Sequence, residues 1–182
     1  MIFRKANKMR DSWKEKCRLF WLHSIPLMTT LMMMFMFLIP IDAVKVNYFR
    51  PSVGAICVFY WTLKRGYLFS YISAFIVGFF IDSYSSTPLG VNILLMMLTA
   101  CITQWLAHYF QNASFNAGWF IFSLVCCGIM LIKWLLISLY FGYLLSFKEI
   151  IFNYLATVMF YPLIAAINVG VQKYLPQERI NE

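Results

Sequence analysis

Residues 67–82, with the sequence YLFSYISAFIVGFFID, form a long apolar run that ends in a single carboxylate. It is too long for the strand of a membrane barrel and shows no strict alternation of apolar and polar residues. In lipid, backbone N–H and C=O groups must pair within their own segment, so a run of this kind forms a helix. We therefore expect a membrane-embedded helix that ends at Asp82.

The composition of the whole chain argues against an ordinary soluble domain. Of its 182 residues, 62% are hydrophobic and 12% are charged. Soluble domains carry about 25% charged residues, so this chain lacks the charge to coat a water-facing surface. Aromatic residues make up 19% of the chain, a high share that suits rings placed at two membrane interfaces. The length is that of one compact domain.

Apolar runs also organise the rest of the chain. A span needs about 20 apolar residues to cross the hydrocarbon layer of a bilayer. The expected spans are 20–40, 48–63, 67–82, 90–110, 118–142 and 150–172. The sequence thus predicts an all-α polytopic membrane protein, a compact bundle of six transmembrane helices, or of five if 48–82 is a re-entrant pair. Residues 1–18 precede this domain, which covers 19–173, and 174–182 form a short tail.

Positive charge is concentrated at the N-terminus. The formal net charge is +8, and residues 1–18 hold seven Lys or Arg against two Asp or Glu. A basic segment directly before an apolar run is an orientation signal, so we expect the N-terminus and the C-terminal tail to be cytoplasmic. The same segment is expected to bind anionic lipid headgroups. Nucleic acid is not expected as a partner, because no basic folded face remains once the helices lie in lipid.

The sequence holds no motif for catalysis or for a cofactor. The five cysteines are odd in number and have no CxxC spacing, so we interpret them as small apolar fillers. The methionines of the first span point in different directions around a helix, which favours packing over a copper site. HExxH, P-loop, GxGxxG and catalytic-triad patterns do not occur, so we expect no enzyme, no metal and no cofactor.

Two ionisable residues lie deep in apolar runs, Asp82 and Lys133. Each stands fifteen residues from the expected cytoplasmic start of its span, or roughly 22 Å along a helix. A charge at such a depth is costly unless it is paired. One hypothesis is therefore that Asp82 and Lys133 form a buried ion pair that stabilises helix packing. The alternative is that each side chain extends alone to the outer headgroups.

Small residues form a stripe on the helix that carries Asp82. Ser70, Ala74, Gly78 and Asp82 recur at every fourth position and so share one helix face. Faces of this type let neighbouring helices approach closely in lipid. The stripe is interpreted as a packing face within the chain, or as a docking face for a partner's helix.

A polar turn follows Asp82 and joins it to the next span. Its sequence, SYSSTPLG at 83–90, carries hydroxyl side chains together with Pro88 and Gly90, and Asn92 opens the next helix. Hydroxyl and carboxylate groups in such turns bind backbone groups that a helix end leaves unpaired. We expect a helix–loop–helix joint at the outer surface, which is a second candidate for partner binding.

The central part of the chain resembles the family of the rod shape-determining protein MreD. The elements that carry the resemblance are RP at 50–51, YW at 60–61, AFIVGFFID at 74–82 and PLGVN at 88–92. Each element is short, and it is their order and spacing together that match the pattern of the family. The motifs cover about residues 50–105, and the rest of the chain agrees only in hydropathy. The long basic N-terminal segment and the Met-rich first span are not part of the pattern.

The resemblance implies a membrane scaffold without catalysis in the bacterial inner (cytoplasmic) membrane. Proteins of this family belong to the cell-wall elongation machinery. They associate with MreC, a protein with one membrane span, and through it with the MreB filament and the peptidoglycan polymerase and transpeptidase. The family also resembles the six-helix substrate-binding subunits of energy-coupling-factor transporters, which is a likeness of fold alone.

Two other functions are weighed against the scaffold. A carrier, or the substrate-binding subunit of a transporter, would need a cavity lined by polar residues such as Trp61, Asn92, Gln104 or Asn168. A membrane enzyme acting on lipid would need paired carboxylates or a nucleophile with its base, and the sequence shows neither.

Overall fold

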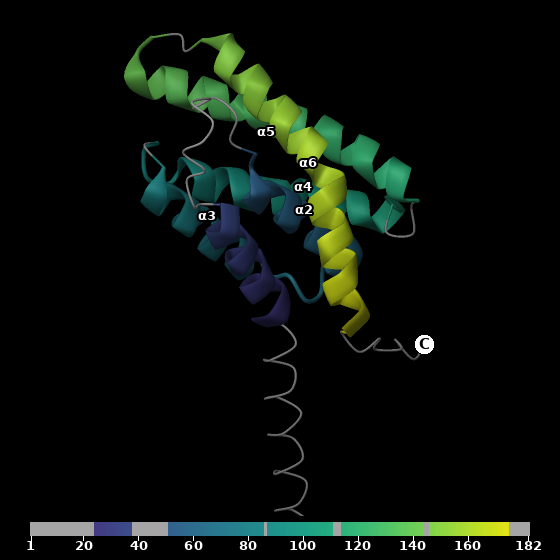
Figure 1. Ribbon diagram of the computed structural model, residues 1–182. Coiled ribbons are helices and arrows are strands. Elements are labelled where there is room, and N and C mark those ends of the chain that lie inside the picture. Colours follow the sequence, from purple (N-terminus) through teal and green to yellow (C-terminus); the bar gives the residue numbers. More distant parts are fainter. Residues whose placement is uncertain (1–23, 38–50, 86, 111–113, 144–145, 175–182) are drawn as a thin grey trace, which may run out of the picture.

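A computed structural model describes residues 24–37, 51–85, 87–110, 114–143 and 146–174. Within these ranges the chain is helical and contains no strand, which confirms the predicted all-α fold (Figure 1). The basic N-terminal segment and most of the predicted C-terminal tail lie outside the described residues.

The described helices correspond one to one with the six expected spans. The first of them is Ser24–Phe37. It is followed by α2 (Val53–Arg65), α3 (Tyr71–Tyr84), α4 (Val91–Phe110), α5 (Phe115–Phe141) and α6 (Phe147–Tyr174).

The predicted starts of the second and third spans were too early. We expected the second span to begin at residue 48, but α2 begins only at Val53. The backbone N–H of Ser52 donates instead to Thr157 Oγ1 of α6 at 3.0 Å, which holds this segment outside the helix. Similarly, α3 begins at Tyr71 rather than at residue 67, because the Ser70 side chain accepts the backbone N–H of Ile72 and caps the helix.

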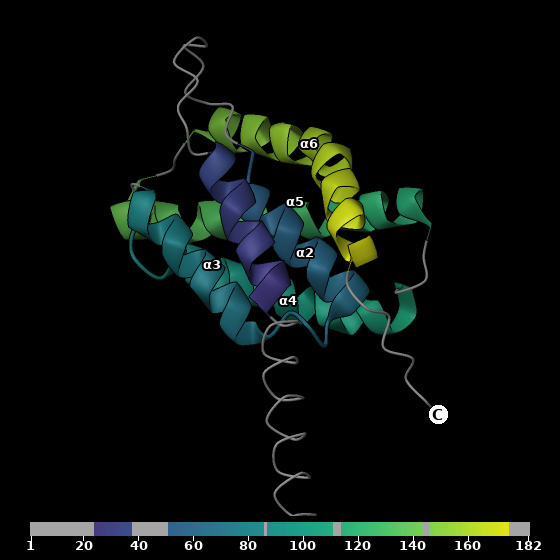
Figure 2. The same ribbon diagram turned by 60° about the horizontal axis from the view of Figure 1, so that its bottom comes forward.

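Among the described helices, α4, α5 and α6 are long and apolar enough to cross a membrane, whereas α3 and Ser24–Phe37 are shorter. The α2 helix has only 13 residues, and 12 of them are buried. It packs against α4 and α6, with fewer contacts to α3 and α5, so it forms the centre of the bundle. Figure 2 shows α3 to one side of this centre, next to α4.

Aromatic side chains fill the core where α2, α5 and α6 meet. The ring of Phe122 in α5 stacks on Tyr161 in α6 with centroids 4.6 Å apart. It also meets Phe59 of α2 edge-on at 5.1 Å. Both arrangements are favoured by the ring quadrupole and add to the free energy gained from burial. The α6 helix changes direction along its length (Figure 2), and Pro162 inside it removes one backbone donor and explains a bend.

We predict that Phe122→Ala lowers the free energy of unfolding by about 3–5 kcal/mol, because Phe122 is 1% exposed and its removal leaves a cavity between two rings. The control is Phe120→Ala on the same helix, where the side chain is 73% exposed and its loss should change stability little. Thermal unfolding in detergent, followed by circular dichroism, measures both variants. Equal unfolding temperatures for the two variants would contradict this packing.

Candidate functional site

The carboxylate of Asp82, in the last turn of α3, is bound by the start of α4. Its Oδ2 atom accepts the backbone N–H of Gly90 at 2.8 Å and that of Ile93 at 3.3 Å. Its Oδ1 atom accepts the backbone N–H of Asn92 at 3.1 Å and the side-chain Nδ2 of Asn92 at 2.8 Å. Asp82 is 3% exposed, so these four donors replace its hydration.

The Asp82 side chain caps the N-terminus of α4, although Asp82 itself belongs to α3. The first N–H groups of any α-helix have no partner inside the helix. A Ser or Asp directly before the helix usually accepts them, but Gly90 precedes α4 and has no side chain to do so. Asp82 takes that role from α3, and the positive end of the α4 dipole favours its negative charge. A buried carboxylate is thereby stabilised without a cation in direct contact.

Asn92 links the cap to the polar turn. Besides Asp82, its Nδ2 group donates to Thr87 Oγ1 at 2.8 Å and to Ser85 Oγ at 3.3 Å. Thr87 Oγ1 in turn donates to Ser85 Oγ at 3.1 Å. Ser85 also bonds the carbonyl of Ile81 through both its backbone N–H and its hydroxyl, which ends α3. The turn from α3 to α4 is therefore fixed by a network of side chains rather than by backbone bonds alone.

Two glycines make the close contact of α3 with α4 possible. A Cβ atom added to Gly78 would lie 2.5 Å from Ile93 Cα and 2.9 Å from the Asn92 carbonyl oxygen, so only glycine fits there. Gly90 has a φ angle of +100°, a backbone conformation that residues other than glycine rarely adopt. Close approach at Gly78 is what brings Asp82 within hydrogen-bond distance of α4.

The structure brings most of the predicted site residues together. Ala74 is fully buried, and Gly78 and Asp82 contact α4 of the same chain, so this face is occupied within the chain. Ser70 lies apart from it as the exposed cap of α3. The carbonyl of Pro88 accepts the N–H of Val91 at the start of α4.

Lys133 lies near this cluster but does not bond to it directly. Its charge and that of Asp82 interact through space, yet no ion pair joins Lys133 to another residue in the part of the chain that the structure describes. The residue counts behind the equal-depth argument were wrong, because Asp82 is eleven residues from the start of α3 and Lys133 is eighteen from the start of α5. Asn92 nevertheless bonds Asp82 and lines the same cavity as Lys133, so the ion pair of Asp82 with Lys133 stays a prediction.

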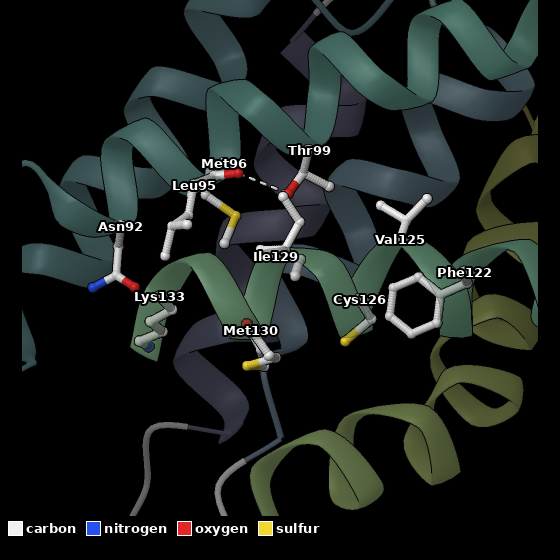
Figure 3. A pocket seen from close by; sticks show the side chains of 12 residues that line it. Asn92, Leu95, Met96, Thr99, Phe122, Val125, Cys126, Ile129, Met130 and Lys133 are labelled. Carbon is white, nitrogen blue, oxygen red and sulfur yellow. Dashed lines mark hydrogen bonds between the residues drawn. The ribbon is translucent and has the colours of Figure 1, made fainter. Parts of the chain in front are cut away.

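A small cavity lies between α4 and α5 and extends to α2. Figure 3 shows Asn92 and Lys133 at one end of it and Phe122 at the other. Its volume is about 20 Å³, enough for a single water molecule, whereas pockets for small-molecule ligands usually measure about 300 Å³ or more. Of the polar residues expected to line a carrier site, only Asn92 lines this cavity.

Sequence reasoning did not identify the partners in two side-chain hydrogen bonds that join α6 to α2. The Asn168 side chain donates to Cys57 Sγ at 3.7 Å, and Tyr60 Oη donates to the Gln172 side chain at 2.6 Å. Isolated polar residues in apolar runs gave the only signal for these contacts. Within the described ranges, no three His, Cys, Asp or Glu side chains gather as metal ligands.

The fold and its sites define a class of protein, an integral membrane protein built as a bundle of apolar helices around a buried α2. The model of one family, rod shape-determining protein MreD, matches residues 17–168, which is most of the chain. The chain belongs to this family, whose members act in rod-shape determination. No match was found among curated proteins or among solved structures.

We predict that Asp82→Asn lowers the free energy of unfolding by about 1–3 kcal/mol. Backbone N–H groups donate to both carboxylate oxygens of Asp82, whereas an amide has one oxygen and one NH₂ group, so at least one buried N–H group loses its acceptor. Glu149→Gln is the control, since Glu149 is an exposed carboxylate in the first turn of α6. Titration with sodium dodecyl sulfate, followed by circular dichroism, measures both. A stability of Asp82→Asn equal to that of the control would contradict the cap.

We also predict that Gly78→Ala destabilises the protein, although alanine favours helices, because its methyl group would press on the backbone of α4. Gly128→Ala, on an open part of α5 where a Cβ meets nothing within 4 Å, should be neutral or stabilising. The two changes should therefore shift the unfolding midpoint in opposite directions. Shifts of the same sign and size would rule out a close contact at Gly78.

Proposed function

We propose that this protein is a non-catalytic scaffold subunit of the bacterial cell-wall elongation complex, and that it binds an MreC-like membrane protein. The family match carries the assignment to rod-shape determination. The partner and the absence of catalysis are inferences from the family and from a site made of structural hydrogen bonds. In this account the protein acts through binding energy alone, by holding its partner in a fixed position.

The outer turn between α3 and α4 is the surface that we propose for the partner. Leu89 at this turn is 79% exposed, the largest exposed fraction of the large apolar side chains that the structure describes. It stands directly before Gly90, whose N–H is held by Asp82. An exposed apolar side chain on a rigid base suits an interface because little conformational entropy is lost when it binds.

The position of this turn relative to the membrane fits a periplasmic contact. With the N-terminus in the cytoplasm, as the basic segment at 1–18 favours, the turn after α3 lies on the outer side. The basic segment would then lie against the anionic inner leaflet. An MreB-like filament and a peptidoglycan synthase would be reached through the partner rather than through this chain.

The cavity between α4 and α5 favours the scaffold over a carrier. Its volume of about 20 Å³ leaves no room for a vitamin-sized molecule. No other observation in the described residues favours transport, so we retain the scaffold as the proposed function.

We predict that Leu89→Ala reduces the amount of an MreC-like protein that co-purifies by about tenfold, because truncating an apolar anchor of an interface costs more than 1 kcal/mol. Leu139→Ala is the control, since Leu139 is also largely exposed but belongs to α5 and not to the turn. Both variants should unfold at the temperature of the unmodified protein. In cells depleted of the native copy, Leu89→Ala should give rounded cells and Leu139→Ala should give rods.

Two results would contradict parts of this proposal. If Leu89→Ala retains full co-purification, the outer turn is not the contact surface, although the scaffold function stands. If depletion of the protein leaves rod cells with their normal shape, the role in elongation itself is wrong.

A further inference from the structure

The hydrophobic part of α3 is too short for an ordinary bilayer. The helix begins after its cap Ser70 and its apolar run ends before Asp82 and Ser83. The run from residue 71 to 81 measures roughly 16 Å along the helix axis. The hydrocarbon layer of a typical bilayer is about 30 Å thick, so the deficit is on the order of 10 Å. Any tilt of α3 away from the membrane normal would increase it.

The α2 helix is also short, with 13 residues, but it is enclosed by other helices and need not match the bilayer. The α3 helix has an exposed side, so its length matters. One side of α3 packs on α4, and Phe80 on another side meets Phe35 of the first helix. The side that remains exposed presents an apolar stripe made by Ile72, Phe75 and Phe79. These three positions are spaced as neighbours on one helix face. Ile72 is 70% exposed, the largest exposed fraction among the large apolar side chains of the helix.

The ends of α3 carry groups that belong at a membrane interface. Tyr67 and Tyr71 are exposed at the start of the helix, and the exposed hydroxyl of Ser83 stands near its end. Tyrosine rings gather where hydrocarbon meets headgroups. Between Tyr71 and Ser83 the rise is only about 18 Å.

The α5 helix, which does not contact α3, is long enough for an ordinary bilayer. The α5 helix has 27 residues, or roughly 40 Å. Its exposed rings Trp119 and Tyr140 are separated by about 32 Å, which matches a full hydrocarbon layer. The two faces of one molecule therefore fit bilayers of different thickness.

We propose that the bilayer beside α3 is locally thinned to about 20 Å of hydrocarbon, while beside α5 it keeps about 30 Å. Lipid, rather than a partner helix, is the occupant that this stripe suits. Helices that dock in membranes do so through small side chains, and the small-residue face of α3 is already filled by α4. The exposed stripe consists of large side chains, so a second helix could not approach its backbone closely.

Paired spin labels measure the local thickness on each face. The α3 pair is Ile72→Cys and Ser83→Cys, and the α5 pair is Leu124→Cys and Leu135→Cys, all at exposed positions. Each pair is eleven residues apart on one helix face, or roughly 16 Å. Each label is introduced singly into the full chain, in which Cys17, Cys101 and Cys127 are replaced by Ser. The buried Cys57 and Cys126 are retained, and a parent without added cysteines must take up no label.

The depth of each label in dioleoylphosphatidylcholine vesicles is obtained from its collisions with oxygen and with a water-soluble nickel complex. The local thickness is the sum of the two depths, each measured from its nearer interface, plus the separation of the labels. This sum does not depend on how high the protein sits in the membrane. We expect about 20 Å for the α3 pair and about 30 Å for the α5 pair.

Two results would overturn the proposal. Equal thickness at the two faces would show that the bilayer is not thinned beside α3. Low collision rates with both reagents at the α3 labels would show that protein, such as a second copy of the chain, covers the stripe. Because the labels replace exposed side chains, a circular dichroism spectrum equal to that of the parent suffices to show that each variant is folded.

Discussion

The structure depends on one constraint, that a buried carboxylate and an uncapped helix start satisfy each other. Asp82 would be costly in a membrane without hydrogen-bond donors, and the first N–H groups of α4 would be costly without an acceptor. Their contact removes both costs and fixes the end of α3 against the beginning of α4. Gly78 allows the two helices to come close enough for this contact, and Gly90 gives the chain the turn that leads into it.

The helices could be predicted from hydropathy, and the turn after Asp82 indicated that a carboxylate there binds unpaired backbone groups, but which N–H groups it accepts could not be predicted. Apolar runs located all six helices, and a lone carboxylate in such a run marked Asp82 as important. The positive charge of Lys133 suggested this residue as the partner of Asp82. The direct bonds of the carboxylate go instead to backbone donors eight to eleven residues further along the chain. A sequence displays side chains and not the orientation of N–H groups. The polar turn at 83–90 was the available sign, because carboxylate and hydroxyl groups in such turns bind backbone groups that a helix end leaves unpaired.

The bonded turn between α3 and α4 and the short apolar run of α3 have the same origin. The network around Asn92 ends α3 early and turns the chain at once into α4, which keeps α3 short. The same network holds the exposed Leu89 on a fixed base. A scaffold that positions a partner needs such a fixed surface, and belonging to the rod shape-determining family is consistent with that use.

Amide hydrogen exchange tests the central constraint most directly, because it reports on the individual backbone donors that the carboxylate accepts. In the unmodified protein, the amides of Gly90, Asn92 and Ile93 should be strongly protected. Asp82→Ala should accelerate their exchange by at least about tenfold, a loss of roughly 1.4 kcal/mol, while the amide of Gly118 in the first turns of α5 keeps its rate. Unchanged protection at all three amides in the variant would show that Asp82 does not hold α4.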